Sequence, residues 1–215
     1  MTRIILIRHG QSIANFTGKF AGHSDFDLTE LGHRQASLAA EYLLAHEKID
    51  KIYASDLLRA YNTAVPFAKA FGLEITPAKE LREIFAGEWE SLSFDHIKEQ
   101  FPKDFNDWMH DFSNARCTGG ESVAELYERV NGYLRKIAEE NDGKTILIAT
   151  HATPVRAFNC FAMGYGAERM ADVSFCGNAA LNVFVYENGK ATIEQSNINC
   201  YLGDLATEVP AKIRA

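Results

Sequence analysis

The sequence predicts an α/β fold, namely a three-layer αβα sandwich with a mostly parallel central sheet. Residues 4–7 and 145–149 form apolar runs that do not alternate with polar positions, as expected of strands buried on both faces. Helical patterns alternate with these and other short strands, which is typical of a parallel sheet covered by helices on both sides. A length of 215 residues with 47% hydrophobic content favours a single domain over residues 1–215.

The first half of the chain supplies strands and helices in alternation, after one long polar segment. Residues 11–27 are predicted to be a loop, and a loop of this length in a compact domain is typical of a functional segment. Thr29 is suited to cap the helix that follows. The further elements expected here are a helix to about residue 44, a strand over 49–54, a helix to residue 71, a strand over 73–76 and an irregular stretch over 80–90.

The second half begins with an aromatic segment. Residues 94–112 place aromatic side chains at helical spacing, which usually indicates core packing. A small helical lid, inserted at about residues 91–120, is the functional alternative and is compatible with it. Ser122 and Glu125 then form a capping box. The remaining expected elements are a helix to about 140, a strand over 145–149, a helix over 154–163 and a β-hairpin over 180–196.

Composition and charge exclude several classes of protein. The formal net charge is −7, so a globally basic nucleic-acid-binding protein is not expected. The apolar run at the N-terminus is too short for a signal peptide, and no later stretch is long enough to span a bilayer. The four cysteines are scattered without a C-x-x-C pair, which predicts reduced, mostly buried thiols in a cytoplasmic protein.

Polar side chains follow the predicted strands at the points where they end. Arg8 and His9 come directly after the first strand, Arg59 follows the second, Glu83 follows the third and His151 follows the fourth. Ligands of open α/β sheets bind outside the carboxyl ends of the strands, so one crevice could hold all of these residues. Arginine beside histidine suggests phosphate chemistry with an imidazole nucleophile. A solvated polar loop is the alternative that three residues alone do not exclude.

Together these positions resemble the phosphoglycerate mutase-like branch of the histidine phosphatase superfamily. The resemblance covers nearly the whole chain, and its blocks occur in the family's order. They are Arg8-His9-Gly10-Gln11-Ser12 with Asn15, residues 20–23, residues 28–32, residues 54–60 with Thr63-Ala64, residues 81–83 with Gly87 and Trp89-Glu90, residues 119–122, and Thr150-His151.

The resemblance implies a role for each matching residue. His9 would be the nucleophile that becomes phosphohistidine, and Glu83 would donate and accept the proton, although three other glutamates lie near it in the sequence. The groups expected around the phosphoryl group are Arg8, Arg59 and His151, with Asn15, Ala21, Gly22 and Ala152 as substrate-binding positions. Arginine and histidine would supply the charge that a metal supplies elsewhere, so neither a metal nor a cofactor is expected.

Some positions depart from the family's pattern. Ala21 stands where mutases usually have threonine, His23 where tryptophan is frequent, and Ser91 and Ala152 where glycine is common. These departures leave the catalytic set complete and place the uncertainty in the substrate. His23 is of interest because its loop should reach the crevice.

The expected function is a metal-independent phosphomonoesterase that acts on a small phosphorylated metabolite through a phosphohistidine. Residues 91–120 are short, aromatic and net acidic, which makes them poorly suited to bind a carboxylate and favours a phosphatase whose leaving group is apolar or less charged. Phosphoglycerate mutase activity is the alternative, and a non-catalytic phospho-ligand-binding protein is a third. An apolar edge strand could also pair two copies into a homodimer.

Overall fold

A six-stranded sheet forms the centre of the molecule in the computed structural model, which describes residues 1–207. The strand order is β3-β2-β4-β1-β5-β6. The first four strands in that order are parallel, while β5 and β6 are antiparallel to their neighbours. The strands are β1 Thr2–Arg8, β2 Lys51–Ser55, β3 Ile75–Ala78, β4 Thr145–Thr150, β5 Leu181–Glu187 and β6 Lys190–Ile198.

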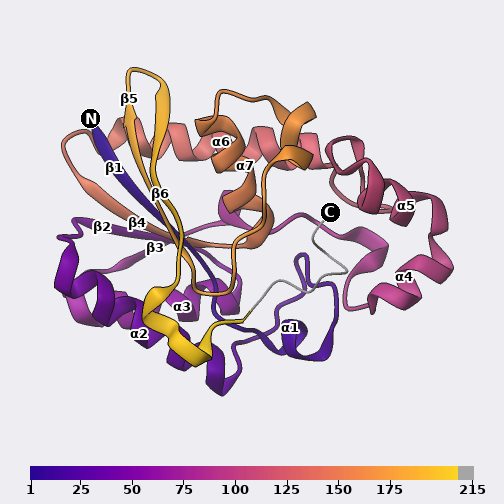
Figure 1. Ribbon diagram of the computed structural model, residues 1–215, viewed down its shortest axis with the longest axis horizontal. Helices are drawn as coiled ribbons and strands as arrows, with labels where there is room; N and C mark the ends of the chain where they lie inside the picture. Colours follow the sequence, from indigo (N-terminus) through magenta and orange to yellow (C-terminus); the bar gives the residue numbers. More distant parts are fainter. Residues whose placement is uncertain (208–215) are drawn as a thin grey trace.

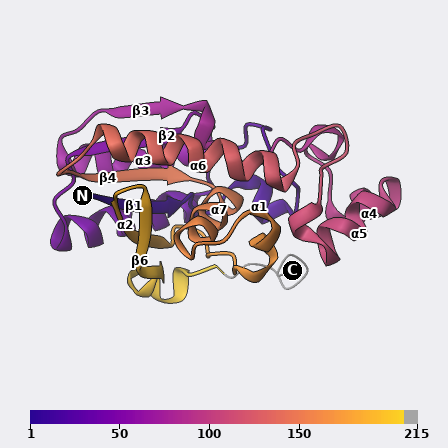
Figure 2. The ribbon, with the colours of Figure 1, turned by 90° about the horizontal axis from the view of Figure 1, so that it is seen from above.

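Helices cover both faces of this sheet, as the sequence predicts (Figures 1 and 2). On one face lie α2 (Glu30–His46) and α3 (Leu58–Phe71), and on the other α6 (Val123–Glu140) and α7 (Ala152–Ala162). The strand β1 is buried on both sides, because alternate isoleucine and leucine side chains enter two separate hydrophobic clusters. The α/β sandwich with a mostly parallel sheet is therefore confirmed.

The aromatic segment forms two helices where one continuous pattern is predicted. α4 (Phe94–Gln100) and α5 (Pro102–His110) meet at Phe101, and a short 3₁₀ turn follows over Phe112–Asn114. Pro102 lacks a backbone N–H and starts the second helix, so a continuous helix was the wrong interpretation. Both helices lie beyond the carboxyl ends of the strands, at the opposite end of the molecule from the N-terminus (Figure 1).

Three further features of the secondary structure differ from the expectation. Residues 11–27 contain the short helix α1 (Ile13–Thr17), which Ser12 and Asn15 start with a capping box. The third strand runs over Ile75–Ala78, two residues later than predicted. α7 begins at Ala152, before Pro154, because proline is tolerated in the first turn of a helix. Short 3₁₀ turns also occur over Lys79–Leu81, Gly87–Trp89, Ala167–Asp172 and Cys200–Leu205.

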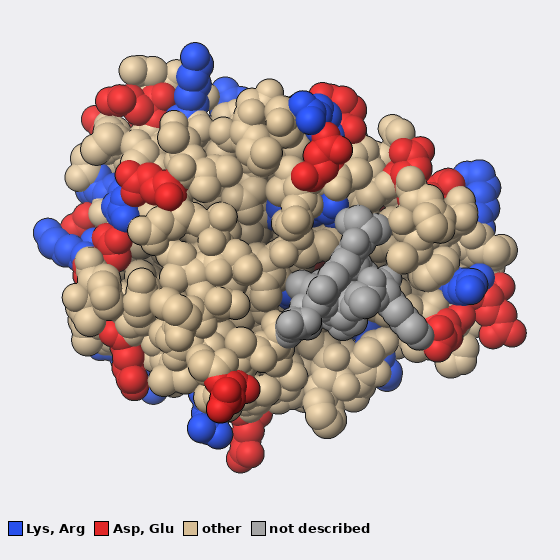
Figure 3. All heavy atoms as spheres, viewed as in Figure 1, with Lys and Arg blue, Asp and Glu red and all other residues tan. Residues whose placement is uncertain are grey.

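The surface of the described residues is predominantly polar at the β6 edge and carries charges of both signs. The sheet has two edge strands, of which β6 exposes the polar residues Glu194, Gln195 and Ser196, while β3 exposes Thr76 and Pro77. Acidic and basic side chains are interspersed around the face shown in Figure 3. No helix within residues 1–207 is long and apolar enough to cross a membrane. The part of the predicted domain over residues 208–215 lies outside the described residues.

Candidate active site

Sheet register brings the predicted strand ends together. Arg8 at the end of β1 pairs with Thr150 at the end of β4, so His9 and His151 follow adjacent strands. Ala54 of β2 pairs with Ala149 of β4, and Ser55 pairs with Ala78 of β3. Because all four strands are parallel, their carboxyl ends open at one edge of the sheet.

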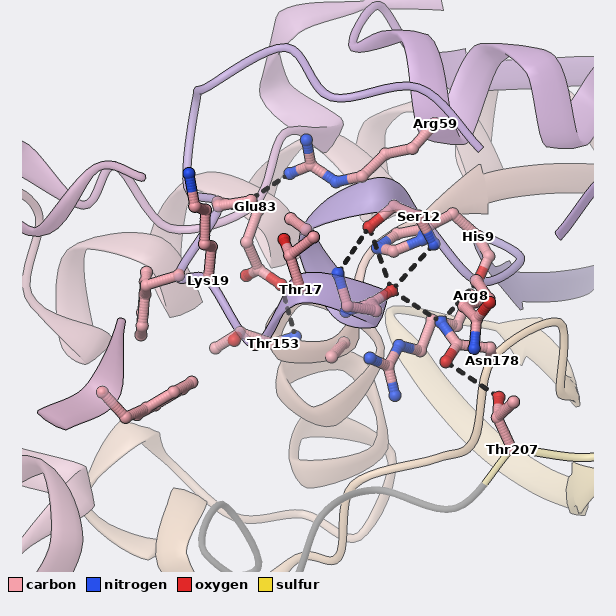
Figure 4. Close-up of a pocket in the computed structure, with 18 of the residues that line it drawn as sticks. Arg8, His9, Ser12, Thr17, Lys19, Arg59, Glu83, Thr153, Asn178 and Thr207 are labelled. Atoms are coloured by element: carbon pink, nitrogen blue, oxygen red, sulfur yellow. Dashed lines mark hydrogen bonds between the residues drawn. The ribbon is translucent and has the colours of Figure 1, made fainter. Parts of the chain in front are cut away.

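A cavity of about 490 Å³ lies at this edge (Figure 4). The predicted site residues on its wall are Arg8, His9, Asn15, Ala21, Arg59, Glu83 and Ala152. His151 lies directly behind His9, with 5.2 Å between the ring centroids. Gly22 is buried beside the cavity and is not part of its wall.

His9 presents one ring nitrogen to the cavity. Its Nδ1 lies 2.7 Å from the carbonyl oxygen of Gly10, which can only accept a hydrogen bond. Burial lowers the pKa of His9 well below 6.5, and the positive charges of Arg59 and Arg8 lower this pKa further. The neutral ring therefore carries its proton on Nδ1, which leaves the lone pair of Nε2 available for attack on phosphorus.

The backbone turn after His9 requires two glycines. A Cβ on Gly10 would lie 2.4 Å from the carbonyl oxygen of Gly32, and a Cβ on Gly32 would lie 2.1 Å from the carbonyl oxygen of Gln11. The N-terminus of α2 therefore packs directly on the backbone after His9. This contact fixes the direction in which the chain leaves β1.

His151 is fully buried and has one ring nitrogen without a protein partner. Its Nε2 lies 2.8 Å from the hydroxyl oxygen of Ser55. Its Nδ1 has no hydrogen-bond partner among the described residues. Burial, followed by the charge of Arg59, lowers the pKa of His151 well below 6.5. His151 is not itself part of the cavity wall, and a buried polar atom without a partner so close to a cavity is suited to contact a bound ligand.

Two buried arginines supply the positive charge. Arg8 donates a hydrogen bond to the carbonyl oxygen of Cys176 over 2.7 Å, while its Nε is left without a partner. Arg59 donates to the backbone carbonyl oxygens of residues 21, 22 and 24 over 2.8–2.9 Å. Burial lowers the pKa of Arg59 to about 10, so it remains a cation at neutral pH. These contacts hold both guanidinium groups at the wall of the cavity.

Glu83 is the one glutamate of its block on the cavity wall. Its Oε1 accepts a hydrogen bond from the backbone N–H of Ile84 over 2.9 Å, and its Oε2 accepts one from Thr153 over 3.3 Å. Glu80 and Glu88 are exposed and line no part of the cavity. Of the four glutamates in this block, Glu83 is therefore the one whose position suits it to contact a ligand in the cavity.

Glu90 has a different place, which the sequence did not indicate. Its carboxylate accepts hydrogen bonds from the backbone N–H groups of His23, Ser24 and Ala86 over 2.6–3.1 Å. His23 in turn places its Nε2 3.1 Å from the carbonyl oxygen of Glu83. Glu90 and Arg59 thus fix residues 21–24 from two sides, and His23 contacts the backbone of Glu83 while its ring stays off the cavity wall.

A polar network that the sequence did not reveal orients Asn15. The Oδ1 of Asn15 accepts hydrogen bonds from Ser12 and from the side-chain amide of Asn178, each over 3.1 Å. Asn178 also donates to the carbonyl oxygen of His9 over 3.1 Å and accepts from the hydroxyl of Thr207 over 2.9 Å (Figure 4). With its oxygen engaged, Asn15 has its Nδ2 donors available to the cavity.

Aromatic side chains, α1 with the residues that follow it, and the segment at 91–120 form the outer part of the wall. Phe20 and Trp108 lie on it, with ring centroids 5.3 Å apart, which joins α5 to the loop after α1. The other members of the outer wall are Thr17, Gly18, Lys19, Ser93, Phe94, Asp95 and Phe175. Within residues 1–207, no group of three or more His, Cys, Asp or Glu side chains could hold a metal ion.

A known protein family matches nearly the whole chain that forms this site. The profile of the histidine phosphatase superfamily (branch 1) matches residues 4–199. This chain belongs to the histidine phosphatase superfamily. The resemblance inferred from the motifs is therefore confirmed, and this member of the superfamily is a phosphatase, as its relatives indicate.

Several histidine phosphatases are similar to it over most of their length. Phosphoserine phosphatase 1 of Hydrogenobacter thermophilus is 34% identical over 97% of this chain and 98% of that protein. Metal-independent phosphoserine phosphatase of Arabidopsis thaliana is 30% identical over 90% of this chain and 80% of that protein. Two crystal structures of Entamoeba histolytica phosphoserine phosphatase, one of a mutant in complex with phosphoserine and one in complex with 3-phosphoglyceric acid, each align with a TM-score of 0.82 and 25% identity, over 94% of this chain and 100% of theirs.

Proposed function

We propose that this phosphatase hydrolyses a small phosphomonoester through a phosphohistidine on His9, with phosphoserine as its foremost substrate. The observation that carries the proposal is the neutral ring of His9, whose Nε2 faces a cavity flanked by Arg8 and Arg59. The names of the relatives from Hydrogenobacter, Arabidopsis and Entamoeba support phosphoserine.

In the first step, the lone pair of His9 Nε2 forms a bond to phosphorus while the bond from phosphorus to the substrate oxygen breaks. Arg8, Arg59 and the unpartnered nitrogen of His151 stabilise the charge on the phosphoryl oxygens, and the Nδ2 of Asn15 is a further donor. Glu83, in its protonated form, gives its proton to the leaving oxygen. The alcohol then departs with that proton.

In the second step, water replaces the alcohol. Glu83, now a carboxylate, takes a proton from the water as its oxygen attacks phosphorus, and the bond between phosphorus and Nε2 breaks. Inorganic phosphate leaves and His9 returns to its neutral form. The backbone N–H donors of Ile84 and Thr153 hold the Glu83 carboxylate in place for both steps. Ala21 and Ala152 line the cavity beside the bound phosphate, and Gly22 allows the loop to pack closely against the backbone of Ile84.

Hydrolysis is favoured over mutase activity by the charges of the lid segment. Two of its basic residues are occupied outside the cavity, since Lys103 pairs with Asp107 and Arg116 pairs with Glu125. A mutase must hold its substrate through repeated transfers and exclude water. The aromatic wall formed with α5 supplies no cation for that purpose.

The test is phosphate release in the presence of EDTA. We expect the intact protein to release phosphate from phosphoserine and p-nitrophenyl phosphate, and His9→Ala to abolish both reactions. Rapid quenching at alkaline pH should trap an acid-labile phosphohistidine in the intact protein only. Release that survives the substitution would show another nucleophile, and isomerised phosphoglycerate with little free phosphate would favour the mutase.

The finer expectations on location and assembly are also proposals. A cytoplasmic location is supported by the four free cysteines, three of which are buried. A homodimer that pairs edge strands would use β3 or β6, the two edges of the sheet, and of these β6 exposes polar side chains. Sedimentation at micromolar concentration tests the homodimer directly.

A further inference from the structure

Lys19 is a cation on the cavity wall to which the proposed function gives no role. It lies on the outer wall, directly after the left-handed cap Gly18 that ends α1. Its backbone N–H donates to the carbonyl oxygen of Ala14 over 2.9 Å, and its backbone pairs with Ser93 at the start of α4. The Cα of Lys19 is therefore fixed between α1 and the lid segment, while its long side chain remains free to adjust.

Lys19 differs from the other cations on the wall in its exposure and in its contacts. Arg8 and Arg59 are buried and donate to backbone carbonyl oxygens. Lys19 is exposed, and its ammonium group has neither an ion pair nor a hydrogen bond with any side chain in the described part of the chain. A cation on a cavity wall without an internal anion is available to an anion of the ligand.

The position of Lys19 assigns it to the leaving group. In the view of Figure 4, Lys19 and Glu83 lie on one side of the cavity, and Arg8 and Asn178 lie on the other. Glu83 must lie next to the oxygen that it protonates, so the part of the substrate beyond that oxygen lies on the same side. The leaving group therefore extends toward Lys19, while the phosphoryl group stays between His9 and the two arginines.

We propose that Lys19 binds a carboxylate on the leaving group and thereby selects phosphomonoesters of carboxylic acids. This inference rests on the proposed function. The ligands in the two Entamoeba structures, phosphoserine and 3-phosphoglyceric acid, both combine a phosphate with a carboxylate. A lysine ammonium on a flexible stem suits such a group, because it can follow small differences in where the carboxylate lies.

The experiment compares two substrates that differ by the carboxylate alone, phosphoserine and O-phosphoethanolamine. We expect the intact protein to prefer phosphoserine in kcat/KM. Lys19→Ala should lower kcat/KM for phosphoserine about 10- to 100-fold, the range of a charge-assisted hydrogen bond, and lower it for O-phosphoethanolamine less than about threefold. Lys19→Arg keeps the charge and should retain most of the preference, whereas Lys19→Glu should reverse it.

Lys190→Ala is the matched control, because it removes an equal charge from the exposed hairpin between β5 and β6. It should leave the ratio of the two substrates unaltered. An equal loss on both substrates in Lys19→Ala, or no loss on either, would overturn the inference. So would an intact protein that cleaves both substrates equally well, although the phosphomonoesterase would then stand. An intact protein that releases phosphate from neither p-nitrophenyl phosphate nor phosphoserine would overturn the proposed function and this inference with it.

Discussion

At the residue scale, burial decides what each side chain of the site can do. His9 and His151 lie in contact, and both have a lowered pKa because water is excluded from their rings. A neutral His9 is a nucleophile, whereas a protonated one would have no lone pair. The same burial strengthens the interaction of Arg8 and Arg59 with an anion, since little solvent screens them.

The role of Glu83 can be separated from binding by the choice of leaving group. Glu83→Gln keeps the shape of the side chain but cannot donate an acidic proton. We expect kcat for phosphoserine, whose alkoxide needs a proton, to fall about 10²- to 10⁴-fold. For p-nitrophenyl phosphate, whose leaving group is stable as an anion, the loss should be much smaller. Steady-state kinetics with both substrates measures this, and equal losses would argue against Glu83 as the acid.

We expect Asn178 to position His9 and Asn15, and kinetic measurements on variants can test this role. Its amide donates to the His9 carbonyl oxygen and to Asn15 Oδ1. Asn178→Asp would place a carboxylate oxygen against both acceptors, so we expect kcat/KM to fall more than tenfold, mainly through KM as Asn15 turns away. Asn178→Ala removes the donor without the repulsion and should cost less. If the aspartate variant retained the original KM, Asn178 would not position Asn15.

At the scale of elements, the loop over residues 21–24 links two halves of the site. Arg59 of α3 donates to its carbonyl oxygens, and Glu90 accepts from its N–H groups. The loop therefore determines where the Arg59 guanidinium lies. Close packing leaves it a single position, because Gly22 lies against the backbone of Ile84.

Gly22→Ala tests this packing. The new Cβ would lie 2.4 Å from the carbonyl oxygen of Ile84 and 2.5 Å from Glu90 Oε1, so the loop must shift. We expect about 1–3 kcal/mol loss of unfolding free energy and at least tenfold lower kcat/KM. Gly132→Ala in α6 is the control, because its Cβ meets nothing within 4 Å and should stabilise the helix by about 0.5–1 kcal/mol. Urea unfolding and kinetics of both variants decide the matter.

At the scale of the whole molecule, the buried histidines link stability to pH. A histidine whose folded-state pKa is lowered binds its proton more readily in the unfolded chain. The stability is therefore complete above pH 6.5 and is lost as pH falls through the window below 6.5. Two such histidines imply a loss of about 2–3 kcal/mol between pH 7.5 and 5.5.

Chemical denaturation at several pH values checks this expectation. The free energy of unfolding should fall over this range, and a variant with His9→Asn and His151→Asn should show a flatter profile. A profile of the same steepness in both proteins would mean that other groups cause the pH dependence. The acid limb of kcat/KM should likewise lie below pH 6.5, since neutral His9 persists there.

Much of the fold was readable from local patterns. The apolar run after Arg3 and the run after Lys144 became the central strands, Thr29 caps α2, and Ser122 with Glu125 forms the capping box of α6. These signals act between residues within a few positions of one another. The order in which charged residues follow the strand ends also indicated the site, because parallel strands share one edge.

Tertiary structure decided the contacts between distant segments. Asn178 lies 163 residues from Asn15, and Glu90 lies 66 residues from Ser24, so no local pattern could join them. Pro102 was visible in the sequence, yet the aromatic spacing around it concealed the break. The register of β1 on β4 sets the distance between His9 and His151, because side chains at strand ends meet only when the strands are aligned. The sequence by itself thus determined most of the elements and the set of residues expected to react, whereas long-range packing determined their mutual geometry and their pKa values.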